Sequence, residues 1–211
     1  MKQISLILID PQRGFCSPTG SLGKEYGVGE ICEITRVIPN IKKALSESSR
    51  RHVVSSSYSV AQFTNGNTNH GLANLCVPDI NSDCAIIDEF SEVEFNSHSI
   101  KHEQSALSSS VFVKEIDNDI RLGIERFVVA GFLLEHCVKK TAEDLKKHLV
   151  NTNSKVFFCN DLSASRSEKY KNGIVADTIK SLNSSGIQTE LWQSIRTYQS
   201  QAESVHTLIC D

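Results

Sequence analysis

Three residues of the chain combine chemically reactive side chains with positions at the ends of predicted strands. Asp10 closes the apolar run LILID, Lys101 follows a strand candidate at 97–100, and Cys137 follows VVAGFLLEH and opens a predicted helix. A thiol in the first turn of a helix feels the positive end of the helix dipole, which lowers its pKa, and the amides of that turn can bind an oxyanion. A carboxylate that takes the thiol proton and an ammonium that balances the charge would complete a nucleophilic site.

Each of these residues also has a structural explanation. An Asp before Pro commonly opens a turn, a single Lys is usually solvated, and a single Cys is usually buried as small core filler. Residue types alone do not decide between the two explanations. The assignment therefore depends on elements that bring the three side chains together.

Short apolar runs alternate along the chain with segments of helical periodicity. Strands are predicted at 4–9, 52–57, 126–131, 155–160 and 187–191, with weaker candidates at 85–87 and 97–101. Helices are predicted over 34–45, with Pro39 in the first turn or at a kink, over about 137–149, and over about 168–182. This alternation indicates a three-layer α/β/α fold with a doubly wound, mainly parallel, six-stranded sheet of Rossmann-like type. Ligands bind such sheets beyond the carboxyl ends of the strands, where Asp10, Lys101 and Cys137 are predicted.

The 211 residues are 39% apolar and 22% charged, which fits one globular domain over 1–211 and excludes a disordered or collagen-like chain. A net charge of -3 gives no basic field, so nucleic acid and anionic membrane are not expected as partners. The apolar run at 4–9 is too short for a signal-peptide core or a membrane span. Seven scattered cysteines without a Cys-x-x-Cys pair argue against a disulfide framework and for reduced thiols in the cytoplasm.

Three sequence blocks, in the same order and at similar separations, resemble the motifs of one enzyme superfamily. The block LILIDPQRGFCSPTGSL is similar to a strand that ends in Asp-x-Gln and is followed by an aromatic residue and Gly-Ser-Leu. The block IKHEQSAL is similar to Lys-x-x-x-Ser-Ala-Phe, with Leu107 in place of Phe, and VVAGFLLEHCVKKTAEDL is similar to Gly-x-x-x-x-x-Cys-Val-x-x-Thr-Ala. On these motifs the chain resembles, from residue 6 to about 191, the isochorismatase-like cysteine hydrolases, which include nicotinamidase and N-carbamoylsarcosine amidohydrolase.

The resemblance implies a role for each reactive residue. Asp10 is the catalytic base, Lys101 the catalytic lysine and Cys137 the nucleophile. The resemblance also implies a cis peptide between Phe132 and Leu133, with the amides of Leu133 and Cys137 forming the oxyanion hole. The implied reaction is hydrolysis of a C–N bond in a small amide or carbamoyl compound through a thioester. The expected walls of the substrate pocket are Phe15, Tyr58, Phe63 and Phe132.

Two departures from the family pattern bear on the function. Leu133, Leu134 and Glu135 stand where the family usually has Ala-Thr-Asp, and a bulky pair there would change the pocket or the cis bond. This departure keeps open the alternative of a non-catalytic relative with a binding or scaffold role. The second departure concerns metal, because Ser57 and Ser59 stand where nicotinamidases carry an Asp-x-His pair after the second strand.

The expected donor set near the site is unsuitable for a metal ion. Hydroxyl groups are poor ligands for a divalent cation, and the one imidazole nearby, His70, is a lone loop histidine. We therefore expect no metal and no other cofactor, and we expect nicotinamide to be a poor substrate. Isochorismatase itself also fits poorly, since it resembles this chain but lacks the nucleophilic Cys. A metal-free hydrolase of another small substrate stays open as an alternative.

Two further residues are assigned roles outside the reaction. His136 is adjacent to Cys137, and neighbouring residues on a helix point in different directions, so no Cys-His dyad is expected. Asp161, which follows the predicted strand at 155–160, is expected to act as a structural cap. The predicted partners are a small amide-type substrate and further copies of the chain in a dimer or tetramer.

Overall fold

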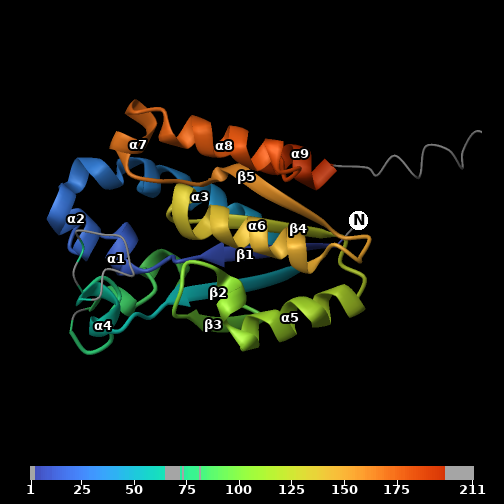
Figure 1. Ribbon diagram of the computed structural model, residues 1–211, viewed down its shortest axis with the longest axis horizontal. Coiled ribbons are helices and arrows are strands. Elements are labelled where there is room, and N and C mark those ends of the chain that lie inside the picture. The colour runs from blue at the N-terminus through green and yellow to red at the C-terminus, as the bar shows by residue number, and fades with distance from the viewer. Residues whose placement is uncertain (1–2, 65–71, 73, 81, 198–211) are drawn as a thin grey trace, which may run out of the picture.

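The computed structural model describes residues 3–64, 72, 74–80 and 82–197, and its centre is a six-stranded sheet (Figure 1). Every neighbouring pair of strands is parallel, and the order across the sheet is β3-β2-β1-β4-β5-β6. The strands are β1 (Ile4–Ile9), β2 (Arg50–Ser56), β3 (Ser97–Lys101), β4 (Arg126–Gly131), β5 (Lys155–Ser163) and β6 (Gln188–Glu190). The predicted doubly wound α/β fold is confirmed.

Helices cover both faces of the sheet (Figure 1). One face packs against α3 (Cys32–Glu47) and α9 (Trp192–Thr197), and the other packs against α5 (Ser110–Arg121), α6 (Lys139–His148) and α8 (Ile174–Ser184). Shorter helices are α1 (Arg13–Cys16), α2 (Ser21–Tyr26), α4 (Val60–Thr64) and α7 (Ser167–Lys171), with 3-10 turns at Val28–Ile31, Ser82–Cys84, Asp88–Phe90 and Ala106–Ser108. Within the described ranges, no helix is both long enough and apolar enough to cross a bilayer.

Strand β1 shows why the strands are apolar without interruption. Successive side chains of a strand point to opposite faces, so Leu6 and Leu8 join the core beneath α3 while Ile7 and Ile9 join the core beneath α5 and α6. All six residues of β1 are buried. Because each face of the sheet has its own layer of helices, the central strands need no solvent-facing side.

The strand order changes direction between β1 and β4. From β1 the chain passes through α3 to β2 and then to β3 at one edge, and it returns to β4 on the other side of β1 before it reaches β5 and β6. The loops that follow β1 and β4 therefore diverge and leave a crevice at the carboxyl ends of these strands. Asp10 directly follows β1, and Cys137 lies in the turn that follows β4.

Two local predictions differ from the structure, and a third is corrected in part. Residues 85–87 form no strand, because Ile86 makes only an isolated antiparallel bridge with Gln12. The helix predicted over about 168–182 is divided into α7 and α8 at Gly173, whose φ of 76° lies in the left-handed region that ends a helix. Pro39 lies in the middle of α3 and not in its first turn, so a kink at Pro39 stays a prediction.

Candidate active site

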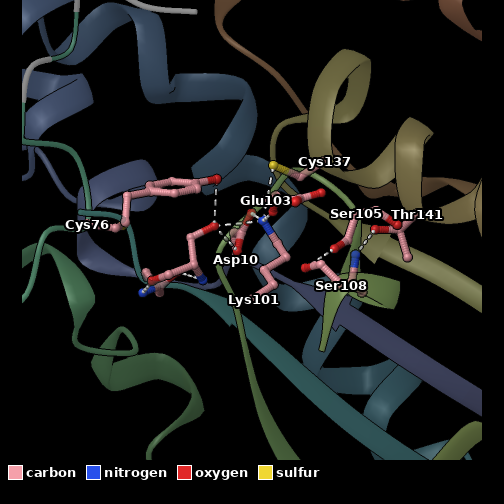
Figure 2. Close-up of polar contacts among 12 residues, drawn as sticks. Asp10, Cys76, Lys101, Glu103, Ser105, Ser108, Cys137 and Thr141 are labelled. Carbon is pink, nitrogen blue, oxygen red and sulfur yellow. Dashed lines mark hydrogen bonds and ion pairs between the residues drawn. The ribbon is translucent and has the colours of Figure 1, made fainter. Parts of the chain in front are cut away.

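The three reactive residues predicted from the sequence lie together at the carboxyl ends of the strands (Figure 2). Asp10 follows β1, Lys101 is the last residue of β3, and Cys137 lies in the turn after β4. Lys101 Nζ is 3.0 Å from Asp10 Oδ2 and donates to Cys137 Sγ at 3.3 Å. Asp10 and Lys101 are fully buried, and Cys137 is 5% exposed. The thiol is therefore the member of this group closest to the surface.

Ser56, the last residue of β2, belongs to the same cluster and was not among the residues predicted from the sequence. Its Oγ accepts from Lys101 Nζ at 2.7 Å, donates to Asp10 Oδ1 at 2.9 Å and lies 3.0 Å from Tyr58 Oη. Ser56 is 1% exposed. The signal in the sequence is the serine run 55–57, which by itself does not show which hydroxyl faces the neighbouring strands.

Gln12 holds the backbone of Ser56 in place. Its Oε1 accepts from the Ser56 amide at 2.7 Å, and its Nε2 donates to the carbonyls of Ser56 and Cys84 at 2.9 Å and 3.0 Å. A buried amide whose donor and acceptor are both satisfied is fixed in one orientation. The chain turns sharply just before Gln12, because Asp10 has a φ of 52°, a conformation that Asp tolerates better than most residues.

Close backbone packing precedes the nucleophile. Gly131 has a φ of 116°, and a Cβ atom at this position would lie 2.2 Å from the carbonyl oxygen of Ile9, so only glycine fits. The peptide bond between Phe132 and Leu133 is cis. The cis bond implied by the family resemblance is therefore present, with Leu133 in the place of the smaller residue of the family.

Residues Leu134–Val138 form a single π-helical turn that leads into α6. The carbonyl of Leu133 accepts from the amides of His136 at 3.1 Å and Val138 at 3.3 Å. The Cys137 amide lies between these two donors in the sequence and is not bonded to that carbonyl. This arrangement is compatible with the predicted use of the Leu133 and Cys137 amides as oxyanion donors.

The electrostatics of the cluster contradict the expected lowering of the thiol pKa. Burial raises the pKa of Cys137 to about 12, with Lys101 opposing this shift and Asp10 adding to it. For Lys101, burial acts to lower the pKa, but the charge of the Asp10 carboxylate acts against burial, and the pKa is raised above its ordinary value. Burial also raises the pKa of Tyr58. The resting site therefore favours a thiol, an ammonium and a phenol at neutral pH.

A cavity of about 980 Å³ opens above Cys137. Its apolar wall includes Phe15, Tyr58 and Phe63, three of the four predicted pocket residues. The fourth, Phe132, is fully buried in the core beneath α3 and does not line the cavity. Of the two residues joined by the cis bond, Leu133 alone faces the cavity, which is why the prediction for Phe132 was wrong.

The cavity also has a charged wall, made by Glu135, His136, Arg166 and Lys169. The Glu135 side chain is 6% exposed, and its Oε1 lies 3.7 Å from His136 Nε2. Burial lowers the pKa of His136, with Lys169 and Arg166 adding to this shift and Glu135 opposing it. His136 thus pairs with Glu135 while Cys137 contacts Lys101, an arrangement that agrees with the expectation of no Cys-His dyad.

Local hydrogen bonds fix the backbone at the expected metal positions. The Ser57 amide donates to the carbonyl of Lys101 at 2.9 Å, and the Ser59 amide and hydroxyl donate to Gln62 Oε1 at 2.7 Å and 3.3 Å. In the part of the chain that the structure describes, no three His, Cys, Asp or Glu side chains are arranged to hold a metal ion. His70 lies outside the described residues, so independence from metal stays a prediction.

Asp161 has the structural role predicted for it. Its Oδ1 accepts from the backbone amide of Trp192, the first residue of α9, at 2.9 Å. The same oxygen lies 3.1 Å from Cys159 Sγ. Asp161 therefore caps the start of α9 and ties this helix to β5.

Comparisons with known proteins agree with this fold. A protein-family model described as the isochorismatase domain matches residues 5–178. An isochorismatase family protein from Desulfovibrio vulgaris superposes with a TM-score of 0.66 at 16% identity, over 98% of this chain and 100% of that chain. No curated protein sequence matches the chain.

Two solved structures with named activities also share the fold. The pyrazinamidase/nicotinamidase from Streptococcus mutans has a TM-score of 0.63 at 16% identity, over 89% of this chain and 99% of that chain. N-carbamoylsarcosine amidase from Thermoplasma acidophilum has a TM-score of 0.56 at 15% identity, over 90% of this chain and 96% of that chain. Identities this low show a common fold and leave the substrate to be argued from the site.

Proposed function

The chain belongs to the isochorismatase family, a family of hydrolases, and we propose that it is a cysteine hydrolase that cleaves a C–N bond in a small amide or carbamoyl compound. The observation that carries this proposal is the contact of one buried ammonium, Lys101 Nζ, with both the Asp10 carboxylate and the Cys137 thiol. A base, a charge-balancing cation and a nucleophile in contact beside a cavity are the groups that covalent catalysis requires.

In the first step the thiol of Cys137 transfers its proton to Asp10 as the sulfur attacks the substrate carbonyl. Burial keeps the thiol protonated at rest, so the thiolate forms only when substrate is in place. Lys101 stays charged throughout and stabilises the negative charge that moves from Asp10 to the sulfur.

The attack places a negative charge on the former carbonyl oxygen, which the amides of Leu133 and Cys137 bind. Collapse of this intermediate breaks the C–N bond, the electron pair moves to nitrogen, and the proton held by Asp10 is delivered to it. A thioester on Cys137 remains. Water then hydrolyses the thioester with Asp10 again acting as the base.

Two features support a small amide-type substrate. Phe15, Tyr58 and Leu133 provide an apolar wall close to the nucleophile, which suits a small organic group. Two solved structures with the same fold are named as amidases. The expectation that nicotinamide is a poor substrate rests on Ser57 and Ser59 and stays a prediction.

The non-catalytic alternative depended on the residues Leu133, Leu134 and Glu135. The contacts of Lys101 with Asp10 and Cys137 are present despite this departure, which favours the enzyme. Assembly of the chain into a dimer or tetramer stays a prediction. Light scattering coupled to gel filtration tests it by measuring the molar mass in solution.

The experiment is a screen for ammonia or amine release from a panel of small amides, ureas and carbamoyl amino acids, with nicotinamide included. The wild type and Cys137→Ala are assayed side by side, with Cys32→Ala as a control because Cys32 is exposed on α3. We expect turnover of at least one panel compound by the wild type and Cys32→Ala, and none by Cys137→Ala. Release by Cys137→Ala, or no release by any protein, would contradict the proposal.

A further inference from the structure

A line of hydroxyl groups leads from Asp10 to the cavity. Ser56 Oγ lies 2.9 Å from Asp10 Oδ1 and 3.0 Å from Tyr58 Oη. Asp10, Ser56 and Tyr58 are 0%, 1% and 8% exposed. Tyr58 lines the cavity together with Cys137, whereas Asp10 does not line it. Ser56 and Tyr58 therefore give a proton on Asp10 a hydrogen-bonded path to the cavity that is separate from the contacts of Lys101 with Asp10 and Cys137.

The direction of these hydrogen bonds depends on the charge of Asp10. The Ser56 hydroxyl has one proton and two lone pairs, and Lys101 Nζ donates to one lone pair at 2.7 Å. While Asp10 is a carboxylate it accepts the Ser56 proton, so Tyr58 donates to the second lone pair of Ser56. The Tyr58 oxygen then presents its own lone pairs to the cavity, where they can accept the N–H of a substrate amide.

Protonation of Asp10 reverses this direction. The Lys101 ammonium lies 3.0 Å from Oδ2, and a proton avoids the oxygen beside a cation, so the protonated carboxyl carries its hydrogen on Oδ1. Oδ1 is the oxygen that faces Ser56. Asp10 then donates to Ser56, Ser56 donates to Tyr58, and Tyr58 donates into the cavity.

We propose, on the basis of the function proposed above, that Ser56 and Tyr58 relay the proton of Asp10 to the leaving nitrogen. As the C–N bond breaks, its electron pair moves to nitrogen and takes the proton of Tyr58 Oη. Tyr58 takes the proton of Ser56 Oγ, and Ser56 takes the proton of Asp10 Oδ1. Each hydroxyl gains one proton and loses one, Asp10 becomes a carboxylate again, and the amine leaves neutral.

The Tyr58 hydroxyl receives a replacement proton as it gives one up, so no phenolate accumulates in the buried site. The relay therefore moves a proton without creating a new buried charge.

The test compares an amide with a 4-nitrophenyl ester of the same acyl group. The amide is the panel compound with the highest kcat/KM. The leaving 4-nitrophenoxide needs no proton, whereas the amide nitrogen needs one, so loss of the relay slows the amide alone. Tyr58→Phe removes only the hydroxyl, and we expect its single-turnover acylation rate with the amide to fall on the order of 100-fold, with the ester rate nearly unchanged.

Two further measurements support the comparison. Ser56→Ala is expected to slow the amide more than the ester, and Ser57→Ala, one position along the chain, is expected to slow neither. In mixtures of H₂O and D₂O the wild-type amide rate should follow a curve, because several protons move in one step. The Tyr58→Phe rate should follow a straight line.

Equal loss on amide and ester in Tyr58→Phe, or no loss on the amide, would overturn the relay and leave the proposed function intact. In that case the wild type still cleaves the amide and Cys137→Ala does not, which shows that only the relay has failed. Failure of the wild type to cleave any panel amide, or cleavage by Cys137→Ala, would overturn both the function and the relay.

Discussion

Two polar clusters lie at opposite ends of the same three strands, and one of them faces the cavity above Cys137. The carboxyl-end cluster consists of Asp10, Ser56, Lys101 and Cys137. The amino-end cluster consists of Ser5, Arg50, His52, Ser97 and Asp119. In each cluster β1 or the residue after it, β2 and β3 supply side chains. Both contain a carboxylate in contact with a serine hydroxyl and a basic group.

In the amino-end cluster both carboxylate oxygens of Asp119 have hydrogen-bond partners. Asp119 Oδ2 accepts from Ser5 Oγ at 2.7 Å and lies 2.8 Å from His52 Nε2, while Oδ1 accepts from Arg50 Nε at 2.7 Å. Burial acts to raise the pKa of Asp119, but its hydrogen bonds to His52, Ser5 and Arg50 outweigh burial and lower the pKa. None of these side chains lines the cavity above Cys137.

The carboxyl-end cluster has unused bonding capacity. Asp10 Oδ2 accepts no well-aligned hydrogen bond from the described residues, although Lys101 Nζ is 3.0 Å away. The Cys137 thiol lines the cavity. A serine, a histidine and an aspartate in contact are thus no sign of an active site on their own. Position beyond the carboxyl ends of the strands, with reactive groups open to a cavity, is the feature that separates the two clusters.

The largest expected effect is loss of turnover in the carboxyl-end cluster. Cys137→Ala and Asp10→Asn should each lower kcat/KM on the best panel amide by about four orders of magnitude or more, because a nucleophile and its base act as one unit. Circular dichroism should show that both variants stay folded. Substantial turnover by folded Cys137→Ala would remove the distinction between the clusters.

The converse change in the amino-end cluster should affect stability. Asp119→Ala leaves His52 and Arg50 without their buried partner and should lower the free energy of unfolding by about 3–5 kcal/mol, with activity per folded molecule retained. Asp117→Ala is the control on the same helix, because its side chain is 50% exposed and its pair with His148 adds little. Urea titration measures the free energy of unfolding of both variants. Loss of turnover in folded Asp119→Ala would contradict a purely structural role for this residue.

The pH dependence of this effect has a defined sign. Because folding lowers the pKa of Asp119, its stabilising contribution is complete above the ordinary carboxyl pKa of about 3.9 and is lost as pH falls through the lower folded value. The deficit of Asp119→Ala relative to the wild type should therefore shrink in acid. A deficit that grows in acid would contradict the assignment.

A smaller effect is expected from Lys101→Met on the reactivity of Cys137. Lys101 acts to lower the thiol pKa, so its removal should raise that pKa and slow alkylation by iodoacetamide about tenfold for each pKa unit gained. Lys147→Met is the control, since its side chain is 74% exposed on α6. A pH profile of alkylation that does not change in Lys101→Met would show that the ammonium does not act on the thiol.

The smallest effect is expected from removal of metal. Turnover should be the same before and after exhaustive chelation, because Ser57 and Ser59 offer hydroxyls where carboxylate and imidazole would be needed. Elemental analysis of the purified protein is the companion measurement. Stoichiometric zinc, iron or manganese, or activity that chelation abolishes and metal restores, would return a nicotinamidase-like metal site to the carboxyl-end cluster.

The sequence predicts those features that depend on local pattern. The apolar runs that form β1 and β4 and the reactive residues that follow them are recognisable, because buried parallel strands are continuously apolar and ligands bind at their carboxyl ends. Gly131 and the cis bond after Phe132 follow from the family motif. The strand order is therefore the one further fact required to predict that Asp10, Lys101 and Cys137 lie together.

Features that depend on side-chain direction and burial were not predictable in the same way. Ser56 is one of three consecutive serines, and only the pleat of β2 shows that its hydroxyl faces Asp10 and Lys101. Phe132 lies next to a pocket residue but turns into the core. The thiol pKa of Cys137 depends on burial, which raises it and which a sequence pattern does not report.

The central claim is that Cys137 forms a thioester with the acyl part of the substrate. Mixing the protein with the best panel amide, quenching in acid and recording the intact mass tests this most directly. The account predicts an added mass equal to the acyl group, mapped to the peptide that contains Cys137, released by hydroxylamine and absent from Cys137→Ala. Turnover without any such adduct under conditions that trap acylation, or an adduct on another residue, would contradict it.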